Sequence, residues 1–267
     1  MSWLQTEPFR QTVLVVDDQP AVVQALYESL SDEYRILKAT SAAEALQVCR
    51  SRLPDLVLMD VVMPEVDGLE ACKQLKADPA TRDIPVIFVT AQVDPRQETL
   101  GLSVGAVDFI VKPVNPYVVR ARLKTHLSLA RTRSLLVATV DASDDGILVT
   151  DLTGRISSMN RAFVRMWGIP LDQMHEATNE SICSVMRSRL RDPKHYVRDW
   201  IEQLLGYDTL EGADALQLLD ERVIERHSAP LQINGGMRGQ VLRFRDVTER
   251  RRTAETLRRL NDSLELR

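Results

Sequence analysis

The sequence predicts two domains of different fold class, an α/β domain with a doubly wound parallel sheet and an α+β domain with an antiparallel sheet. Three observations lead to this prediction. Short apolar runs alternate with helical patterns in the first half, and short strands separated by turns follow in the second half. The length of 267 residues is enough for two domains of about 100–200 residues each.

The composition argues against several classes of protein. Hydrophobic residues make up 44% and charged residues 27%, values that argue against disorder and collagen. With 34 Lys+Arg against 38 Asp+Glu the net charge is −4, so we expect no nucleic-acid partner. The three cysteines form no CxxC pair, which argues against a disulfide framework or a zinc knuckle. The sequence shows neither a signal peptide nor an apolar run of the roughly 20 residues that span a bilayer, so we expect a cytoplasmic chain without membrane contact.

Five short runs rich in apolar and β-branched residues predict a parallel sheet that is covered on both faces. Helical patterns lie between them: Pro20 suits a first helical turn, and Ser41 with Glu44 predicts a capping box. The second run is the weakest and suits an edge strand. The runs are Val13–Val16, Arg35–Ala39, Leu56–Met59, Val86–Val89 and Phe109–Val111.

Polar side chains stand at the carboxyl ends of four of these runs. They are Asp17, Asp18, Asp60, Thr90 and Lys112. In open α/β sheets this edge binds ligands. Three carboxylates brought together repel one another and call for a cation, and oxygen-only ligands suit Mg²⁺. An aspartate can take a phosphoryl group, and the lysine and the hydroxyl can then bind its oxygens.

Four blocks of the first half resemble the signature blocks of a response-regulator receiver domain, in the same order. They read VLVVDDQP, LVLMDVVMPEVDGLE, VIFVTA and GAVDFIVKP, and the resemblance covers about residues 11–130. It implies a flavodoxin-like, five-stranded sheet, with Asp60 as phospho-acceptor, Lys112 as phosphate-binding lysine and a cis peptide between Lys112 and Pro113. The implied Mg²⁺ ligands are Asp17, Asp18, Asp60 and the backbone carbonyl of Val62.

The resemblance also implies a switch. Phosphorylation adds about −1.5 to −2 charges, Thr90 moves toward the phosphoryl group, and Phe109 fills the vacated space, which shifts a pre-existing equilibrium. A simple core aromatic is the alternative role of Phe109. Val62 and Gln92 flank the water that hydrolyses the acyl phosphate in receivers. Because Val62 cannot orient a water, we expect slow self-dephosphorylation.

One helix is expected to run from the first domain into the second over residues 115–141. This stretch contains no glycine, and its only proline, Pro116, stands near its start. Small and apolar residues recur at a 4-3-4-3 spacing that fits either a solvated linker or a dimerising signalling helix. They are Leu123, Leu127, Ala130, Ser134 and Val137.

Strand pairs and a capped helix predict the antiparallel second domain. Gly146–Asp151 and Arg155–Met159 flank an Asp-Leu-Thr-Gly turn, and Asn160 caps a short helix. A polar, mostly helical stretch is expected over residues 172–205. Further strands are expected at Ala213–Leu219, Arg222–Leu231 and Gly239–Val247.

The stretches GILVTDLTGRISSMNRAF, RVIERHSAPL and VLRFRDVTERR resemble a PAS domain over about residues 135–248. The resemblance implies that Asp246 and Thr248 couple the sheet to an output helix, with an ordinary strand-to-helix cap as the alternative. A flavin-type sensor would need a reactive cysteine in an Asn-Cys-Arg-Phe-Leu-Gln run, which Cys183 does not match. His195 stands near the helix that carries the axial ligand in haem-binding PAS domains, but a surface histidine is much commoner. We therefore expect an empty pocket or an unidentified small apolar ligand.

The tail over residues 249–267 is expected to form an amphipathic, coiled-coil-like helix. Its apolar seam consists of Val247, Ala254, Leu257 and Leu264. We expect a homodimer formed through the linker helix and this C-terminal helix.

These features favour a response regulator of a two-component phosphorelay that accepts a phosphoryl group on Asp60 from a sensor histidine kinase or a phosphotransfer protein. One alternative is a Mg²⁺-dependent phosphatase, although aspartyl-nucleophile phosphatases carry Asp-x-Asp where this chain has Asp60, Val61 and Val62. Another is the regulatory front of a larger enzyme, a diguanylate cyclase or a hybrid histidine kinase. The chain shows no GGDEF run, phospho-accepting histidine helix or ATP-binding glycine box, so we expect no enzyme activity beyond its own phosphotransfer and dephosphorylation.

Overall fold

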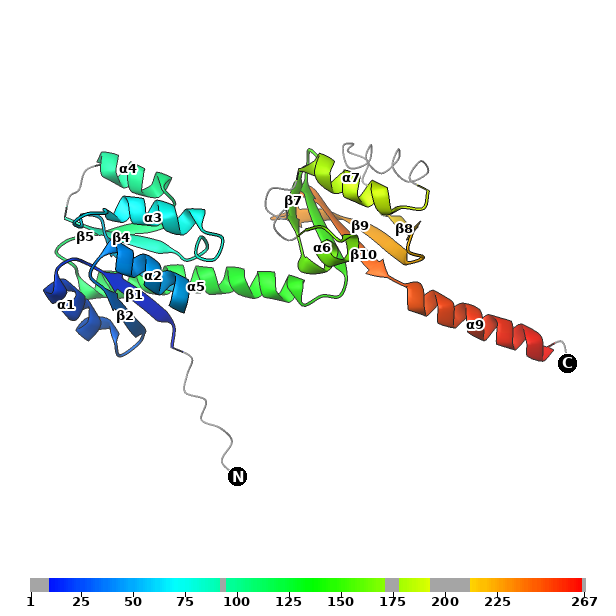
Figure 1. Cartoon of the computed structure of the whole chain (residues 1–267), viewed down its shortest axis with the longest axis horizontal. Helices are drawn as coiled ribbons and strands as arrows, with labels where there is room; N and C mark the ends of the chain where they lie inside the picture. The colour runs from blue at the N-terminus through cyan, green and yellow to red at the C-terminus, as the bar shows by residue number, and fades with distance from the viewer. Residues whose placement is uncertain (1–9, 92–94, 171–177, 193–211, 266–267) are drawn as a thin grey trace, which may run out of the picture. The chain divides into compact units, whose positions relative to one another are not determined.

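The computed structural model describes residues 10–91, 95–170, 178–192 and 212–265. The chain divides into two compact units, Met1–Ser134 and Leu135–Arg267. Each unit has its own five-stranded sheet and its own apolar core (Figure 1).

The first unit is an α/β domain around a parallel sheet of order β2-β1-β3-β4-β5. Every strand expected in this half is present, and the weakest one, β2, lies at an edge as predicted. The strands are β1 (Thr12–Val16), β2 (Arg35–Ala39), β3 (Leu56–Asp60), β4 (Val86–Thr90) and β5 (Asp108–Val111). The helices are α1 (Pro20–Leu30), α2 (Ala42–Arg52), α3 (Gly68–Ala77), α4 (Pro95–Ser103) and α5 (Pro116–Asp141).

Helices cover both faces of this sheet, as the continuous apolar runs predict (Figure 1). Successive residues of a strand point to opposite faces. Leu14 and Val16 of β1 therefore join a cluster with α2 and α3, whereas Val13 and Val15 join a cluster with α1 and α5. Packing on both faces holds the strands rigidly, so their carboxyl ends have a fixed geometry.

Helix α2 is capped differently from the predicted capping box. The Ser41 hydroxyl accepts the N–H of Glu44 at 3.3 Å, as expected. The Glu44 carboxylate, however, accepts the N–H and the hydroxyl of Thr40, at 2.8 and 3.2 Å. The second half of the predicted box is therefore wrong, because Thr40 offers this carboxylate two donors at once.

Helix α5 is continuous over Pro116–Asp141, which confirms that one helix leaves the first unit. Leu123 and Leu127 are buried in the core of that unit, whereas Ser134 and Val137 are exposed. The predicted 4-3-4-3 seam thus packs on the sheet only over its first half.

The second unit contains an antiparallel sheet of order β7-β6-β10-β9-β8. All the expected strands are present. At the turn that joins β9 to β10, β9 ends later and β10 begins earlier than predicted. The turn consists of Asn234 and Gly235, both with positive φ. The strands are β6 (Gly146–Asp151), β7 (Ile156–Met159), β8 (Gly212–Gln217), β9 (Val223–Ile233) and β10 (Gly236–Asp246).

Helices α6 (Arg161–Trp167) and α7 (Asn179–Arg189) lie on one face of this sheet (Figure 1). The ring of Phe163 in α6 lies 5.3 Å from that of Phe244 in β10, measured between centroids, and this pair is buried in the core. Helix α7 confirms part of the helical stretch expected over residues 172–205. Residues 171–177 and 193–211, with His195, lie outside the described residues.

Helix α9 (Thr248–Glu265) follows β10 and confirms the expected C-terminal helix. Leu257 of its predicted seam is exposed, and the side chain of Leu264 lies outside the described residues. Within the described part of the chain, no helix is long and apolar enough to cross a membrane.

Candidate functional site

The sheet of the first unit brings all five predicted polar residues to one edge. Asp17 and Asp18 follow β1, Asp60 ends β3, Thr90 ends β4, and Lys112 follows β5. These four strands are consecutive neighbours in the sheet and run parallel. Their carboxyl ends therefore meet, although Lys112 is 95 residues from Asp17 along the chain.

Lys112 joins two of the three aspartates. Its Nζ donates to Asp60 Oδ2 at 2.7 Å and to Asp17 Oδ2 at 2.8 Å, and both carboxylates are almost fully buried. Burial lowers the pKa of Lys112, but the hydrogen bonds and charges of Asp17 and Asp60 outweigh this effect and leave the pKa above its usual value. Lys112 is therefore a permanent cation at this edge of the sheet.

Backbone N–H groups hold the other oxygens of the same two aspartates. Gln19 N donates to Asp17 Oδ1 at 3.0 Å, and Val62 N donates to Asp60 Oδ1 at 3.3 Å. Each carboxylate thus has one oxygen on its own loop and the other on Lys112, so its orientation is fixed before any ligand binds.

Asp18 completes an acidic cluster. One carboxylate oxygen each of Asp17, Asp18 and Asp60 lies within 4.8 Å of the others. The three carboxylates and the Lys112 ammonium leave a formal charge of −2, which suits a divalent cation. The donor set consists of oxygens only, and Asp18 is partly open to solvent, so the residues fit Mg²⁺, which retains several waters.

Thr90 and Phe109 occupy neighbouring strands beside this cluster. Thr90 is buried, and its carbonyl accepts the N–H of Lys112 at 2.7 Å. Phe109 is paired in register with Phe88 of β4 and packs, half-buried, against the core cluster of α2 and α3. The peptide between Lys112 and Pro113 is cis. Gln92 lies outside the described residues.

Two sequence families match the chain. The response regulator receiver domain matches residues 13–124, and the PAS fold matches residues 140–255. The chain is a receiver domain followed by a PAS domain. It therefore carries domains of two-component signalling, and no catalytic output domain is matched in it.

Curated relatives resemble the chain over part of their length. A Vibrio cholerae protein named "Probable cyclic di-GMP phosphodiesterase" is 33% identical over 204 residues, which cover 74% of this chain and 42% of that protein. "Response regulator PleD" of Caulobacter vibrioides is 42% identical over 115 residues, which cover 42% of this chain and 25% of that protein. The chain thus spans less than half the length of these two relatives.

Solved structures resemble part of the chain. A response regulator from Desulfuromonas acetoxidans is 33% identical, with a TM-score of 0.42, and the match covers 45% of this chain and 98% of that one.

Gly68 is a residue of the receiver site that the sequence patterns did not single out. A Cβ at this position would lie 2.1 Å from the carbonyl oxygen of Asp60, far inside van der Waals contact. The N–H of Gly68 donates to the Val61 carbonyl at 2.9 Å, which brings the start of α3 against the end of β3. The sequence did carry a signal for this residue. Glycine is a poor helix former, yet Gly68 begins a helix eight residues after Asp60.

In the PAS domain, Asp246 and Thr248 connect the sheet to α9. Asp246 Oδ1 accepts the N–H of Thr248 at 2.9 Å and also its hydroxyl proton. The Thr248 hydroxyl oxygen in turn accepts the N–H of Val223 at 2.9 Å. The pair therefore caps α9 and at the same time fastens the beginning of that helix to the beginning of β9.

Proposed function

We propose that this protein is a response regulator that takes a phosphoryl group on Asp60 with the help of Mg²⁺ and relays the change through helices to its PAS domain. The observation that carries the proposal is the contact of Lys112 with both Asp60 and Asp17, beside the third carboxylate of Asp18. A partly buried lysine that reaches the acceptor carboxylate is placed to bind the oxygens of a phosphoryl group on it.

In the proposed reaction, an oxygen of Asp60 forms a new bond to phosphorus while the bond between phosphorus and the donor breaks. The donor is a phosphohistidine of a sensor kinase or phosphotransfer protein, or acetyl phosphate in vitro, which leaves as acetate. Bound Mg²⁺ supplies positive charge to the phosphoryl oxygens, with Asp17, Asp18, Asp60 and the Val62 carbonyl as its proposed protein ligands. Lys112 and the Thr90 hydroxyl bind the remaining phosphoryl oxygens.

The proposed switch moves Thr90 toward the phosphoryl group and Phe109 into the space that it leaves. Phe109 is half-buried, lies on the edge strand β5 and packs against the core cluster of α2 and α3. Since α5 follows β5 directly and continues to Asp141, a change at this edge has a helical route out of the receiver.

The same helices are the proposed dimer contacts. Beyond the part of α5 that packs in the receiver core, exposed apolar side chains continue along it, and α9 carries further ones. Paired helices would remove these side chains from water. They are Leu129, Leu135, Leu136 and Val137 in α5, and Leu257 and Leu260 in α9.

Labelling with radioactive acetyl phosphate tests the acceptor. We expect label on the wild-type chain with Mg²⁺, none with EDTA, and none on Asp60→Asn. Asp55→Asn is the matched control, since Asp55 stands just before β3, at the end of the strand opposite the acidic cluster, and its Oδ2 accepts the N–H of Thr12 at 2.7 Å. Persistent label on Asp60→Asn would place the acceptor elsewhere, and steady turnover of phosphomonoesters would favour the phosphatase alternative.

A second candidate is that these domains regulate an enzyme of cyclic di-GMP metabolism. Its support is the relative named as a cyclic di-GMP phosphodiesterase, whose match covers 74% of this chain and is therefore longer than either domain alone. Immunoblotting of the native source with an antibody to this chain tests it. A band much larger than the 267-residue chain, with phosphodiesterase activity in the immunoprecipitate, supports this candidate, and a band of the chain's own size contradicts it.

A further inference from the structure

The buried side chain of Asn160 in the PAS domain forms hydrogen bonds with the end of α5 and with the beginnings of β6 and α6. Asn160 Nδ2 donates to the carbonyls of Val140 at 3.0 Å and Asp145 at 2.9 Å. Asn160 Oδ1 accepts the N–H groups of Ile147 at 2.8 Å and Phe163 at 2.9 Å. The last turn of α5 and the loop that follows it are therefore fixed to each other.

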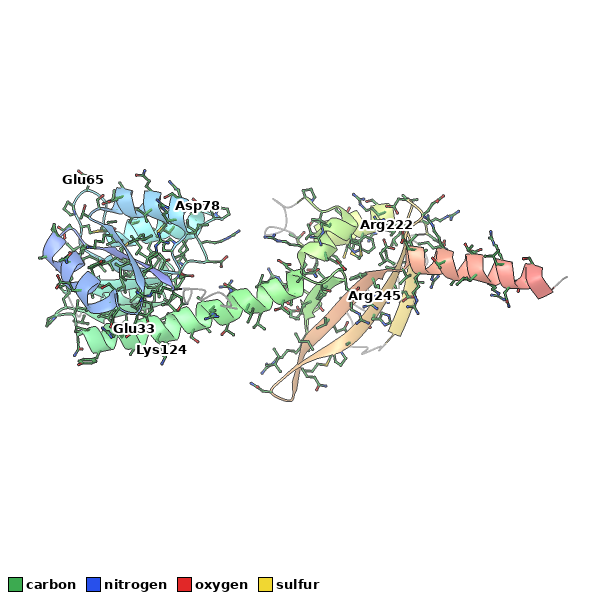
Figure 2. All side chains as sticks on the ribbon, turned by 90° about the horizontal axis from the view of Figure 1, so that it is seen from below. Glu33, Glu65, Asp78, Lys124, Arg222 and Arg245 are labelled. Carbon is green, nitrogen blue, oxygen red and sulfur yellow. The ribbon has the colours of Figure 1, made fainter. Side chains whose placement is uncertain are left out.

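That loop is joined by a second side chain to the last strand of the sheet. Arg245 of β10, labelled in Figure 2, donates from Nε to Asp145 Oδ1 at 2.8 Å and from Nη2 to Asp145 Oδ2 at 2.7 Å. Arg243, two residues earlier on the same face of β10, lies 3.8 Å from this carboxylate. Two parallel hydrogen bonds fix the relative direction of the two groups as well as their distance.

Arg245 adjoins the connection to α9. The next residue, Asp246, accepts from Thr248, whose hydroxyl holds the N–H of Val223. From Asp145 the connection thus reaches the first turn of α9 through Arg245, its chain neighbour Asp246, and the hydrogen bonds between Asp246 and Thr248. Asp145 itself is 100 residues from Arg245 along the chain, so this pair connects the segment that enters the PAS domain to the segment that leaves it.

The contact is open to solvent on one side and largely buried on the other. The side chain of Arg245 is 49% exposed and that of Asp145 is 14% exposed, so solvent screening limits what this ion pair adds to stability. Arg245 also lowers the pKa of Asp145, so the carboxylate is charged and the contact is present throughout the neutral range.

We propose that the contact between Asp145 and Arg245 positions α9 relative to the end of α5, and that a displacement of α5 reaches α9 through it. The inference rests on the proposed function of the receiver, which would supply the displacement. Asp145 and Arg245 act here as positioning residues, distinct from the helix cap formed by Asp246 and Thr248.

Hydrogen–deuterium exchange of the full chain, with and without beryllofluoride and Mg²⁺, tests the proposal. Peptides around Asp60 report the receiver, and peptides of α9 report transmission. We expect beryllofluoride to change exchange in both regions of the wild type, and Arg245→Gln to keep the receiver change while losing at least half of the α9 change. Asp145→Asn should lose as much, and the double variant no more than either single variant. Arg245→Lys, which keeps the charge without the paired geometry, should give an intermediate loss.

Arg251→Gln is the matched control, because Arg251 is an α9 arginine that contacts Glu225 at 3.6 Å and does not link the two segments. Unchanged exchange in β6 and β10 serves as the check that the variants are folded. A wild-type α9 response in Arg245→Gln, or additive losses in the double variant, overturns the inference. A wild type that responds in the receiver and not in α9 overturns it as well but leaves the receiver function standing, whereas no response in the receiver contradicts the proposed function itself.

Discussion

Lys112 Nζ lies 2.7 Å from Asp60 Oδ2 and 2.8 Å from Asp17 Oδ2, so one ammonium bridges two buried carboxylates. The ammonium offsets part of the repulsion among the three aspartates. Lys112 is also the one group of this cluster whose removal makes the formal charge of the site more negative.

Lys112→Met should destabilise the metal-free receiver by about 3 kcal/mol, because it leaves two buried carboxylates without their counter-ion. Saturating Mg²⁺ should recover much of this loss. Without the Lys112 ammonium the three carboxylates carry a formal charge of −3, which a divalent cation offsets. Thermal denaturation in EDTA and in Mg²⁺ measures both effects. Lys124→Met, at an exposed position of α5, should change neither, and equal Mg²⁺ responses in all three proteins would contradict the prediction.

Gly68→Ala should slow phosphorylation of Asp60 and destabilise the receiver by about 1–3 kcal/mol. The new methyl group meets the Asp60 carbonyl, and backbone at the end of a buried strand cannot easily move. Acetyl phosphate labelling rates and denaturant melts give the two readouts. In the control Gly101→Ala, the methyl group meets the Phe88 ring at 3.2 Å, a side chain that can adjust, so a smaller effect on both is expected. Normal labelling of Gly68→Ala would show that the close approach does not matter for the site.

Val62→Asn should shorten the lifetime of the phosphorylated receiver several-fold. Val62 stands two residues after Asp60, is 66% exposed, and its side chain can neither donate nor accept a hydrogen bond. An amide there could orient the hydrolytic water. Decay of the label after removal of acetyl phosphate measures the lifetime, with Leu53→Asn, at the exposed C-cap of α2, as control. A wild-type half-life of only seconds would contradict the expectation of slow self-dephosphorylation.

Asn160→Ala should destabilise the PAS domain by about 2–4 kcal/mol, since it leaves two N–H groups and two carbonyls without their partner. Asn179→Ala is a graded comparison, because that side chain pairs with one N–H, of Ile156, and one carbonyl, of Gly154. Chemical denaturation followed by circular dichroism should rank Asn160→Ala as the more damaging. The reverse order would be inconsistent with a central role for Asn160.

The PAS domain should lose stability at low pH through Asp145. Arg245 lowers the pKa of this carboxyl in the folded state relative to about 3.9 in the unfolded chain. The contribution is therefore complete above the unfolded-state pKa and disappears as the pH falls through the folded-state pKa. Melting curves between neutral pH and pH 3 should show a steeper decline for the wild type than for Asp145→Asn, and parallel curves would exclude the effect.

The sequence by itself determined the order of the strands and helices in both domains and the residue types at the carboxyl ends of the first sheet. These follow from local patterns: apolar runs bounded by Asp17, Asp60 and Lys112, and a helix without glycine after Pro116. The prediction failed at Glu44, where two neighbouring residues offer donors and the backbone conformation decides between them. The Glu44 carboxylate binds Thr40 instead of completing the capping box with Ser41.

Only the tertiary structure decided which oxygens Lys112 holds, how closely Gly68 approaches Asp60, and that Asp145 meets Arg245. Each of these contacts joins segments that are brought together by sheet order and loop conformation, in the last case across 100 residues. A side-chain pattern specifies which face of a strand or helix is buried, because its period is local. The pairing of two polar atoms depends on backbone positions that many distant residues fix together, and no short stretch of sequence contains them.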